Sequence, residues 1–542
     1  MFRPVPRRLS RALSILFVLA WFAQMGLLVR RAYLQDAAHL AADLSQYGST
    51  ASWRGIYYRG EKIGFSVGQI TPVEDGFEIK EDGRLQMILL GATTAVRLST
   101  VARVDRSFAL RSFSFGLDPG TGATQVNGRV DGRRLELEIA TPSGRRTDVR
   151  ELAEPPALSL NLSRRLAAGG LVTGARHAFS VFDPATLTNA PLLVDVLGRD
   201  VVRAAGRPIP AFKVRMTFGT LVSTSWIDDV GEVVREESPL GLVVVKESPE
   251  RATALAVPGQ VMTDILEASA VVPVPARRIE NPNAVELLRV RLTGVDTSGS
   301  DLQGAGQTVT GDVFEVVDAR TLRPGPRDPE AALFLHPEPF LESDAPEIVA
   351  EAALVVEASR VAGVRPGPRA HAERLVRHVN DIIEKKPTVS LPSALEVLRT
   401  RVGDCNEHTA LYVALARALG IPARIAVGLV HLHGAFYYHA WPEVYLAEED
   451  GGLWLPVDPT LNQFPADATH IRLARGGLDR QAALLPVIGR TRMDVLELRL
   501  AEGSAPVLVG RAAQDTRPLG MPSLPRRETG PGSCWRSSRG RR

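Results

Sequence analysis

Apolar and polar residues alternate along much of the first half of the chain. Between about residues 55 and 248, apolar side chains recur at every second position, as in Leu135-Glu-Leu-Glu-Ile139. This period is typical of antiparallel strands that bury one face and expose the other. The runs are separated by residue pairs that favour tight turns, namely Asp75-Gly76, Asp82-Gly83, Asn127-Gly128 and Asp131-Gly132. The pattern predicts an antiparallel β-rich domain over residues 50–255.

Two pieces of this half resemble each other. Val104-Asp105 is followed by Leu110-Arg111, and Ile227-Asp228 is followed by Val234-Arg235. A duplicated sheet unit is one interpretation of this likeness.

The spacing changes to that of helices after residue 345. Apolar residues four apart, such as Leu375 and Val379, are typical of the buried face of a helix. Helix start signals and this spacing predict helices from Pro346 to about Ala362, from Pro368 to Lys385 and from Ser393 to Arg401. These helices open a domain that we place at residues 346–511.

Two further segments carry weaker patterns. Residues 256–345 are mixed and end in a Pro-rich stretch, Asp318 to Pro346, that we interpret as an extended linker. Residues 512–542 are rich in Pro, Ser and Arg, which predicts a disordered basic tail.

An uncharged apolar run, Ala12–Val29, stands near the N-terminus. Its 18 residues are at the short end of the length that spans a bilayer. More arginines precede the run than follow it, which favours a cytoplasmic N-terminus and export of the rest. A cleaved signal peptide is the alternative, but Arg30-Arg31 stands where a small-residue cleavage site is expected. We predict a cytoplasmic tail and signal anchor over residues 1–35.

Composition excludes several classes of function. The chain has 542 residues, too many for one core, and a formal net charge of +3, so we expect no nucleic-acid partner. It has two cysteines, Cys405 in an ordered motif and Cys534 in the basic tail. The chain is therefore not a disulfide scaffold.

Cys405 stands where a helix is expected to begin. It follows Gly403-Asp404, and apolar residues from Leu411 to Leu419 recur three and four apart. Backbone N–H groups and the positive end of the helix dipole would then point at the thiol. Both favour a thiolate of lowered pKa, and the same N–H groups suit a developing oxyanion.

His439 and Asp458 are predicted to lie opposite each other in a hairpin. We expect a loop from His431 to Tyr438, a strand from Ala440 to Leu446 and a return strand from Leu453 to Val457. The turn between these strands lies midway between His439 and Asp458, and facing residues of a hairpin are close neighbours. If the hairpin packs across the helix start, Cys405, His439 and Asp458 form nucleophile, base and orienting acid.

Four sequence blocks surround these residues in order: Gly403-Asp-Cys405, Ala416-Arg-Ala-Leu-Gly-Ile-Pro-Ala-Arg424, His439-Ala-Trp441 and Asp458-Pro-Thr460. Together they resemble the bacterial branch of the transglutaminase-like superfamily. The resemblance implies a papain-like core, a Cys-His-Asp triad at Cys405, His439 and Asp458, and no cofactor or metal. The aromatic residue that helps to hold the oxyanion in animal members has no matching position here. The expected fold class is α+β: an N-terminal membrane helix, an antiparallel β-rich domain and a papain-like core.

Other polar and aromatic residues near the motif have two interpretations. Trp441, Tyr438 and Asn406 are candidates for a substrate groove, although aromatic residues of strands are more often part of a core. His408, His431 and His433 invite a metal site, but no HExxH or paired CxxC motif supports one. The stretch from Asp467 to His470 is a candidate for closing the site.

These expectations combine into a membrane-anchored cysteine enzyme, an acyltransferase or a peptidase/amidase. It would cleave amide or peptide bonds of an extracytoplasmic protein or peptide through a thioester, with hydrolysis favoured over crosslinking. In a bacterium, contact with the inner membrane through residues 12–29 would leave the bulk of the chain in the periplasm. One alternative is a non-catalytic transglutaminase-like binding or envelope-assembly scaffold. Another places the function in the β-rich domain.

Overall fold

The computed structural model describes residues 51–508 apart from short gaps. The gaps are residues 90–91, 121, 143, 219–220, 240, 255–263, 276, 296–300, 339, 364–366, 388–392, 450, 477–488 and 502–506. The predicted signal anchor and the basic tail lie outside the described residues. Within the described part, no helix is both long and apolar enough to cross a membrane.

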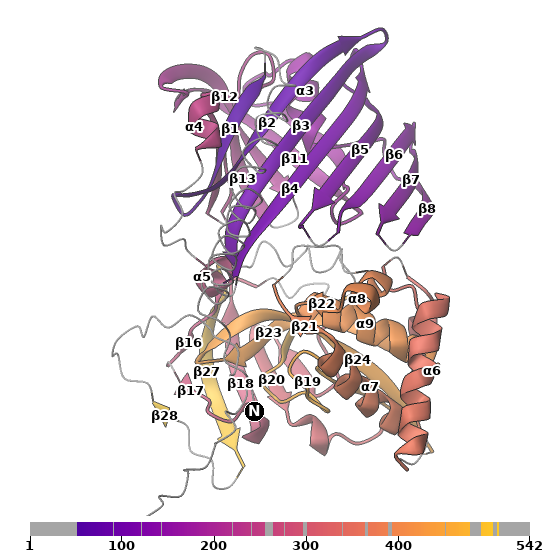
Figure 1. The fold of residues 1–542 in the computed structure, drawn as a ribbon. Helices are drawn as coiled ribbons and strands as arrows, with labels where there is room; N and C mark the ends of the chain where they lie inside the picture. The colour runs from indigo at the N-terminus through magenta and orange to yellow at the C-terminus, as the bar shows by residue number, and fades with distance from the viewer. Residues whose placement is uncertain are drawn as a thin grey trace, which may run out of the picture.

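The β-rich domain contains one fifteen-stranded sheet, drawn in indigo to magenta in Figure 1. The strand order is β8-β7-β6-β5-β4-β3-β2-β1-β15-β14-β13-β12-β11-β10-β9. Neighbours are antiparallel except β9 and β10, so the predicted antiparallel domain is confirmed. The strands are β1 Ser52–Tyr58, β2 Glu61–Val73, β3 Gly76–Leu89, β4 Ala92–Asp105, β5 Leu110–Asp118, β6 Thr124–Asp131, β7 Arg134–Thr141, β8 Gly144–Glu151, β9 Pro156–Ala157, β10 Arg176–Asp183, β11 Thr188–Ala204, β12 Arg207–Phe218, β13 Leu221–Ile227, β14 Val233–Glu237 and β15 Leu242–Glu247.

Strands that are far apart in this order share a core. Phe113 of β5 packs against Phe182 of β10, with ring centroids 5.7 Å apart. Both belong to one buried cluster that also includes Leu158, at the start of helix α3 (Ser159–Ala168). Burial of apolar surface between the two halves therefore folds the sheet over on itself.

Two of the four predicted turn pairs lie inside strands. Asp75-Gly76 and Asp131-Gly132 stand at strand connections, but Asp82-Gly83 lies within β3 and Asn127-Gly128 within β6. Gly128 is needed there because a Cβ atom would lie 2.0 Å from the Phe113 ring of β5. A glycine can thus mark space occupied by a neighbouring aromatic side chain instead of a turn.

The two similar sequence pieces form the same turn. After β4 and after β13, an Asp side chain, Asp105 or Asp228, accepts hydrogen bonds from backbone N–H groups two and four residues further on. Such side-chain bonds stabilise a turn locally. The likeness between the two pieces therefore extends to their hydrogen bonding.

The second half of the chain packs helices on a four-stranded antiparallel sheet of order β25-β24-β23-β26. The predicted helices are confirmed, although the second ends at Ile382. Helix α9 is central, and its residues Leu411, Tyr412 and Leu415 are completely buried in the core that it shares with the sheet and the other helices. The elements are α6 Pro346–Val361, α7 Pro368–Ile382, α8 Ala394–Thr400, α9 Cys405–Ala418, β23 Ala423–Leu432, β24 Ala435–Glu448, β25 Gly451–Pro456 and β26 Ile471–Arg475, with β21 Glu384–Lys385 paired to β22 Val402–Gly403.

A third sheet joins the mixed segment to the end of the described chain. Its order is β16-β27-β18-β20-β19. β27 (Arg492–Leu500) pairs with β18 (Val285–Thr293), so residues on both sides of the predicted boundary at 345/346 form one sheet. Leu288 and Phe314 of this sheet share a buried cluster with Leu429 and Ile471 of the four-stranded sheet. The remaining elements are α4 Pro249–Thr253, α5 Ile265–Ser269, β16 Pro273–Val274, β17 Arg277–Arg278, η2 Pro282–Ala284, β19 Gln307–Thr310, β20 Val313–Val317, η3 Ala319–Thr321, η4 Ala331–Leu335 and β28 Val507–Leu508.

The Pro-rich stretch from Asp318 to Pro346 is packed, contrary to the extended linker that we expected. Phe340 belongs to the buried cluster of the β-rich domain, whereas the next residue, Leu341, belongs to the cluster around α9. The backbone carbonyl of Phe340 also accepts a hydrogen bond of 2.7 Å from the N–H of Ala394 in α8. Two adjacent side chains therefore tie the two domains together.

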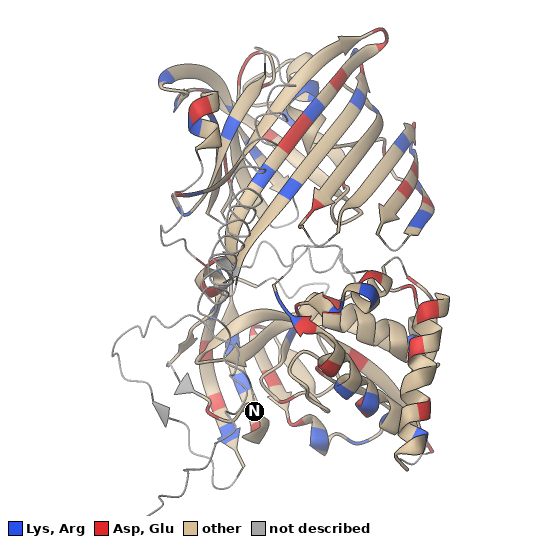
Figure 2. Cartoon of the chain, in the orientation of Figure 1, with Lys and Arg blue, Asp and Glu red and all other residues tan. Residues whose placement is uncertain are grey.

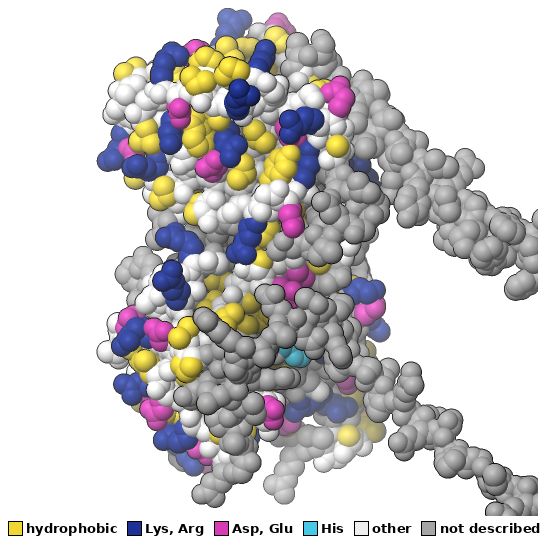
Figure 3. Space-filling view, turned by 90° about the vertical axis from the view of Figure 1, so that its left-hand side faces the viewer, with side chains coloured by type: hydrophobic (Ala, Val, Ile, Leu, Met, Phe, Trp, Pro, Cys, Tyr) yellow, Lys and Arg dark blue, Asp and Glu magenta, His cyan; other side chains and the backbone are white. Residues whose placement is uncertain are grey.

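Charges of both signs are intermingled on the surface. Figure 2 shows Lys or Arg beside Asp or Glu along the strands of the β-rich domain. In a second view, apolar side chains are interspersed with charged ones on the same domain (Figure 3). The described surface in these views therefore has the mixed charge expected from the near-neutral composition.

We expect Phe340→Ala to lower the free energy of unfolding by about 3 kcal/mol, because truncating a buried Phe removes apolar contacts and leaves a cavity. Urea unfolding followed by fluorescence measures the change. Leu333→Ala is the matched control in the same segment, because its side chain is 60% exposed. It should change stability by less than about 0.5 kcal/mol. Equal effects of the two substitutions would contradict a tie at Phe340.

Candidate functional site

Cys405 is the first residue of α9, as the sequence predicts, and a capping box holds it there. The Asp404 carboxylate accepts the N–H of Asn406 at 2.9 Å, and the Glu407 carboxylate accepts the N–H of Asp404 at 2.8 Å. Gly403 leaves room for Glu407, since a Cβ atom at residue 403 would lie 2.2 Å from the Glu407 Cβ. The Gly-Asp-Cys block therefore fixes where the helix begins.

The start of α9 lies against β24 beside His439. Thr409 donates a hydrogen bond of 3.1 Å to the carbonyl of Ala440, and the Ala440 backbone also hydrogen-bonds the Cys405 sulfur. β25 ends at Pro456, which lies opposite Glu443. The residues of β24 that precede Glu443 are therefore not paired with β25, and Ala440 among them lies against the start of α9. Cys405 thus contacts the residue next to His439.

The surroundings of Cys405 disfavour a preformed thiolate. Burial raises the pKa of its thiol well above the ordinary value, and the carboxylate charge of Asp404 acts in the same direction. The hydrogen bond from Ala440 acts against these effects but does not outweigh them. The pKa lowered by the helix terminus, which the sequence predicts, is therefore not what the surrounding groups favour. A reaction at this sulfur needs a base beside it.

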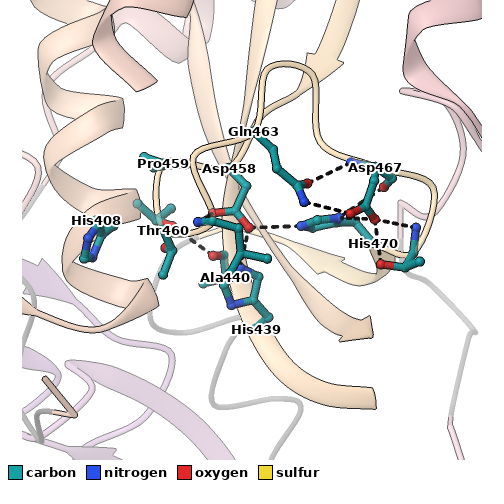
Figure 4. Close-up of polar contacts among 12 residues, drawn as sticks. His408, His439, Ala440, Asp458, Pro459, Thr460, Gln463, Asp467 and His470 are labelled. Carbon is teal, nitrogen blue, oxygen red and sulfur yellow. Dashed lines mark hydrogen bonds and ion pairs between the residues drawn. The ribbon is translucent and has the colours of Figure 1, made fainter. Parts of the chain in front are cut away.

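His439 and Asp458 form a short, buried contact. His439 Nε2 lies 2.8 Å from Asp458 Oδ2, and the Asp458 side chain is completely buried (Figure 4). Burial would raise the pKa of Asp458, but the interactions with His439 and His470 outweigh it and hold this pKa far below its ordinary value. The carboxylate is therefore ionised and can accept the imidazole N–H.

The hairpin that carries this pair differs from the expected one in two details. The expected loop from His431 to Tyr438 is a two-residue turn at His433-Gly434, whose φ angles of 50° and 96° suit a tight hairpin. His439 consequently lies well inside β24. Asp458 lies beyond the end of β25, where its backbone pairs with Gln463, and it reaches His439 through its side chain.

A second histidine shares the Asp458 carboxylate. His470 Nε2 lies 3.0 Å from the same oxygen, Asp458 Oδ2, and His470 Nδ1 lies 3.3 Å from Asp467 Oδ1. Burial lowers the pKa of His470, but its hydrogen bonds with Asp458 and Asp467 outweigh burial and raise it to about 10. From the sequence, the stretch from Asp467 to His470 is predicted only as a candidate for closing the site. The three-residue spacing of Asp467 and His470 was the one signal of their contact.

The candidate groove residues are placed differently from one another. Trp441 is only 1% exposed and stacks beside His439 at a ring distance of 6.1 Å, so its expected place in an open groove is wrong. Tyr438 is half-buried and its hydroxyl lies 3.1 Å from that of Thr491, in the cluster shared with the third sheet. Asn406 is half-buried in the first turn of α9.

The histidines that invite a metal site in the sequence do not group as metal ligands among the described residues. His439, Asp458 and His470 have nitrogen and oxygen atoms within 4.8 Å of one another, but His408, His431 and His433 do not join them. The two Nε2–Oδ2 separations, 2.8 and 3.0 Å, are those of hydrogen bonds between complementary groups. We therefore assign these atoms to hydrogen bonding.

Beside the site, a buried carboxylate fixes β24 to β26. Glu443 is completely buried and accepts hydrogen bonds from Arg424, Arg472 and Arg475. Burial would raise the pKa of Glu443, but the three guanidinium charges outweigh it and lower the pKa to about 2. Arg472 also donates to the carbonyls of Leu302, Gln303 and Gly304, so the cluster ties the mixed segment to the sheet.

A cavity of 720 Å³ lies elsewhere, on the exposed face of strands β3 to β8. Its lining mixes Arg103 and Arg129 with Glu78, Glu136 and Glu138 and carries no cysteine or histidine. The cavity therefore has no part in the chemistry at Cys405.

We expect Glu443→Gln to lower the free energy of unfolding at pH 7 by roughly 3–5 kcal/mol, because it leaves the buried guanidinium charges of Arg424 and Arg472 without their anion, whereas Arg475 keeps its ion pair with Asp301. In the wild type, a folded-state pKa below the ordinary 4.5 contributes stability that is present above pH 4.5 and is lost as the pH falls towards 2. Unfolding measured at several pH values should show that the variant lacks this part of the acid sensitivity.

Glu448→Gln is the matched control, because Glu448 is exposed at the end of the same strand. It should leave both the stability at pH 7 and its acid dependence unchanged. An unchanged pH dependence in Glu443→Gln would contradict the assignment.

Comparison with known proteins agrees with the sequence blocks. Residues 356–459 match the model of the Transglutaminase-like superfamily. No curated protein matches the chain. Among solved structures, a candidate cysteine protease from Cytophaga hutchinsonii is 19% identical, over 38% of this chain and 83% of that chain, with a TM-score of 0.24.

Two further solved structures are similar to parts of the chain. The periplasmic domain of TgpA from Pseudomonas aeruginosa is 18% identical, over 36% of this chain and 96% of that chain, with a TM-score of 0.21. A beta-barrel-like protein from Brucella abortus is 10% identical, over 36% of this chain and 95% of that chain, with a TM-score of 0.29. These TM-scores are too low to carry an argument, so the family match carries the assignment. The chain contains, at residues 356–459, a domain of the transglutaminase-like superfamily.

Proposed function

We propose that the chain is a membrane-anchored cysteine enzyme that hydrolyses amide or peptide bonds of an extracytoplasmic protein or peptide. The observation that carries this proposal is the buried 2.8 Å contact between His439 and Asp458 on the strand that touches Cys405. A nucleophile, a base and an acid that orients the base are the groups that acyl transfer through a thioester requires.

In the proposed reaction, His439 supplies the base that the Cys405 thiol needs. Asp458 accepts the N–H at Nε2, which leaves Nδ1 of His439 as the nitrogen that takes the thiol proton. The sulfur then bonds to the carbonyl carbon of the substrate, and the carbonyl oxygen becomes an oxyanion. His439 returns the proton to the nitrogen of the substrate as the C–N bond breaks, which releases an amine and leaves a thioester on Cys405.

Water completes the proposed cycle. His439 removes a proton from a water molecule as its oxygen bonds to the thioester carbonyl. The C–S bond then breaks, the carboxylic acid leaves, and the thiol regains its proton. An amine in place of water would give a crosslink, and we favour hydrolysis.

The first turn of α9 suits the oxyanion. The N–H of Asn406 already bonds the Asp404 carboxylate, so the N–H of Cys405, at the very start of the helix, is the donor that we assign to the substrate oxygen. The positive end of the helix dipole acts in the same direction.

The second candidate function is a non-catalytic binding or envelope-assembly scaffold that keeps this fold. The raised pKa of the Cys405 thiol favours it, because a neutral thiol is a weak nucleophile. The two candidates differ in whether His439 increases the reactivity of the sulfur.

We expect Cys405 to react with iodoacetamide at pH 7 about 10-fold or more faster in the wild type than in His439→Gln, because only the wild type has a base for the thiol proton. Peptide mapping by mass spectrometry separates Cys405 from Cys534. His378→Gln is the matched control, since His378 has a similar contact of 2.7 Å with Glu351 on the helices of the same domain. Equal rates in the wild type and His439→Gln would favour the scaffold.

The membrane anchor has a separate test. We expect the full chain, expressed in bacteria, to sediment with membranes after washing at high pH, because the apolar run is long enough to span. A variant without residues 1–35 should appear in the supernatant. If the full chain is released by the same wash, the anchor proposal is wrong.

A further inference from the structure

We propose that His470, held by Asp467, is a positioning residue that fixes the Asp458 carboxylate and sets the pH range in which Cys405 and His439 react. This inference rests on the proposed function and deepens it. It concerns residues that the three-residue triad does not include.

The geometry joins four side chains in series. His439 and His470 both direct Nε2 at Asp458 Oδ2, and Asp467 lies on the far side of the His470 ring (Figure 4). The other carboxylate oxygen, Asp458 Oδ1, accepts the N–H of Leu461 at 2.9 Å. Both oxygens of Asp458 are thereby held, so the carboxylate cannot rotate without breaking one of these contacts.

Asp467 is itself fixed from several directions. Its Oδ1 accepts hydrogen bonds from the N–H and the hydroxyl of Thr469, at 2.9 and 2.6 Å. Its Oδ2 accepts the side-chain N–H of Gln463 at 2.7 Å, and Gln463 Oε1 accepts the N–H of Asp467 at 3.0 Å. The ring of His470 therefore stands between two immobile carboxylates.

The charges around His470 favour its protonated form. His470 is 4% exposed, and two carboxylates, Asp458 and Asp467, contact its two ring nitrogens. Burial lowers the pKa of His470, but the hydrogen bonds of its ring with Asp458 and Asp467 outweigh burial and raise this pKa. The other charged or titratable groups that act on these carboxylates are His439, Arg320, Lys385, His408 and the Cys405 thiol.

When His470 is protonated, Asp458 stabilises a second cation, the imidazolium of His439, less strongly. The rings of His439 and His470 have centroids 5.9 Å apart, and both contact one oxygen. When His439 takes the thiol proton, two imidazolium rings share one carboxylate, and like charges at this distance repel. The imidazolium of His439 therefore gives up its proton more readily to the leaving amine, and the anion of Asp458 is still present to orient it.

The test is the rate at which iodoacetate alkylates Cys405 between pH 5 and pH 10, measured by peptide mapping on the full chain. The neutral thiol reacts as His439 takes its proton, so the rate should show a first rise with pH over the range in which His439 becomes able to accept that proton. We expect His470→Gln, which keeps a donor for Asp458 but no charge, to move this first rise to higher pH by roughly one to two units, because His439 then holds its proton more tightly.

Several outcomes separate the possible roles. Curves for the wild type and His470→Gln that differ in height but show their first rise at the same pH would overturn the proposal and leave His470 a structural role. If His470→Gln does not fold, as judged by circular dichroism, His470→Asn is measured with the same expectation. His378→Gln, on the helices of the same domain, should leave the curve unchanged.

A failure of the proposed function has a different signature. In that case the wild-type curve would lack this first rise and would coincide with that of His439→Gln. A first rise in the wild type that His439→Gln abolishes and His470→Gln does not shift would retain the proposed function and overturn only the role of His470.

Discussion

The negative charge of Asp458 is sealed from water, so donors inside the protein have to satisfy it. An ion buried without partners costs several kcal/mol, which is a large part of the stability of a domain. The donors come from three places in the chain: His439 on β24, the backbone of Leu461, and His470 just before β26. Satisfying one carboxylate therefore draws together the segments that surround Cys405.

A second buried carboxylate, Glu443, lies four residues along β24 from His439 and has a different kind of partner. Its three arginines stay charged at all ordinary pH values, so this cluster serves as a permanent support. The partners of Asp458 include two histidines: His470, whose hydrogen bonds with Asp458 and Asp467 raise its pKa to about 10 so that it keeps its charge, and His439, the proposed base. β24 thus carries one buried anion, Glu443, whose partners are fixed in charge, and contacts a second, Asp458, which has a partner that can take part in proton transfer.

Much of the fold could be predicted from local pattern, and the rest depended on distant partners. The alternation in Leu135–Ile139 and the buried stripe of α9 report local structure, and both elements formed as predicted. Gly128 and the Pro-rich stretch around Phe340 differ from the prediction because their roles depend on neighbours from other parts of the chain: the Phe113 ring beside Gly128 and the core of the β-rich domain around Phe340. In the site, hairpin geometry predicted that His439 and Asp458 lie close together, although Asp458 lies beyond the end of β25 and makes the contact through its side chain. His470 was missed as a partner, because nothing local shows that a residue twelve positions beyond Asp458 returns to the same oxygen.

The central claim is that a sulfur, an imidazole and a carboxylate lie in series at the start of α9. The contacts of Ala440 with Cys405 and of Asp458 with His439 give the two ends of this series. The most direct measurement is a crystal structure of residues 51–508, with the separation of Cys405 Sγ and His439 Nδ1 read from it. We expect a separation within about 4 Å, close enough for direct proton transfer. A sulfur that points away from the ring, with a well-ordered side chain filling the space between them, would contradict it.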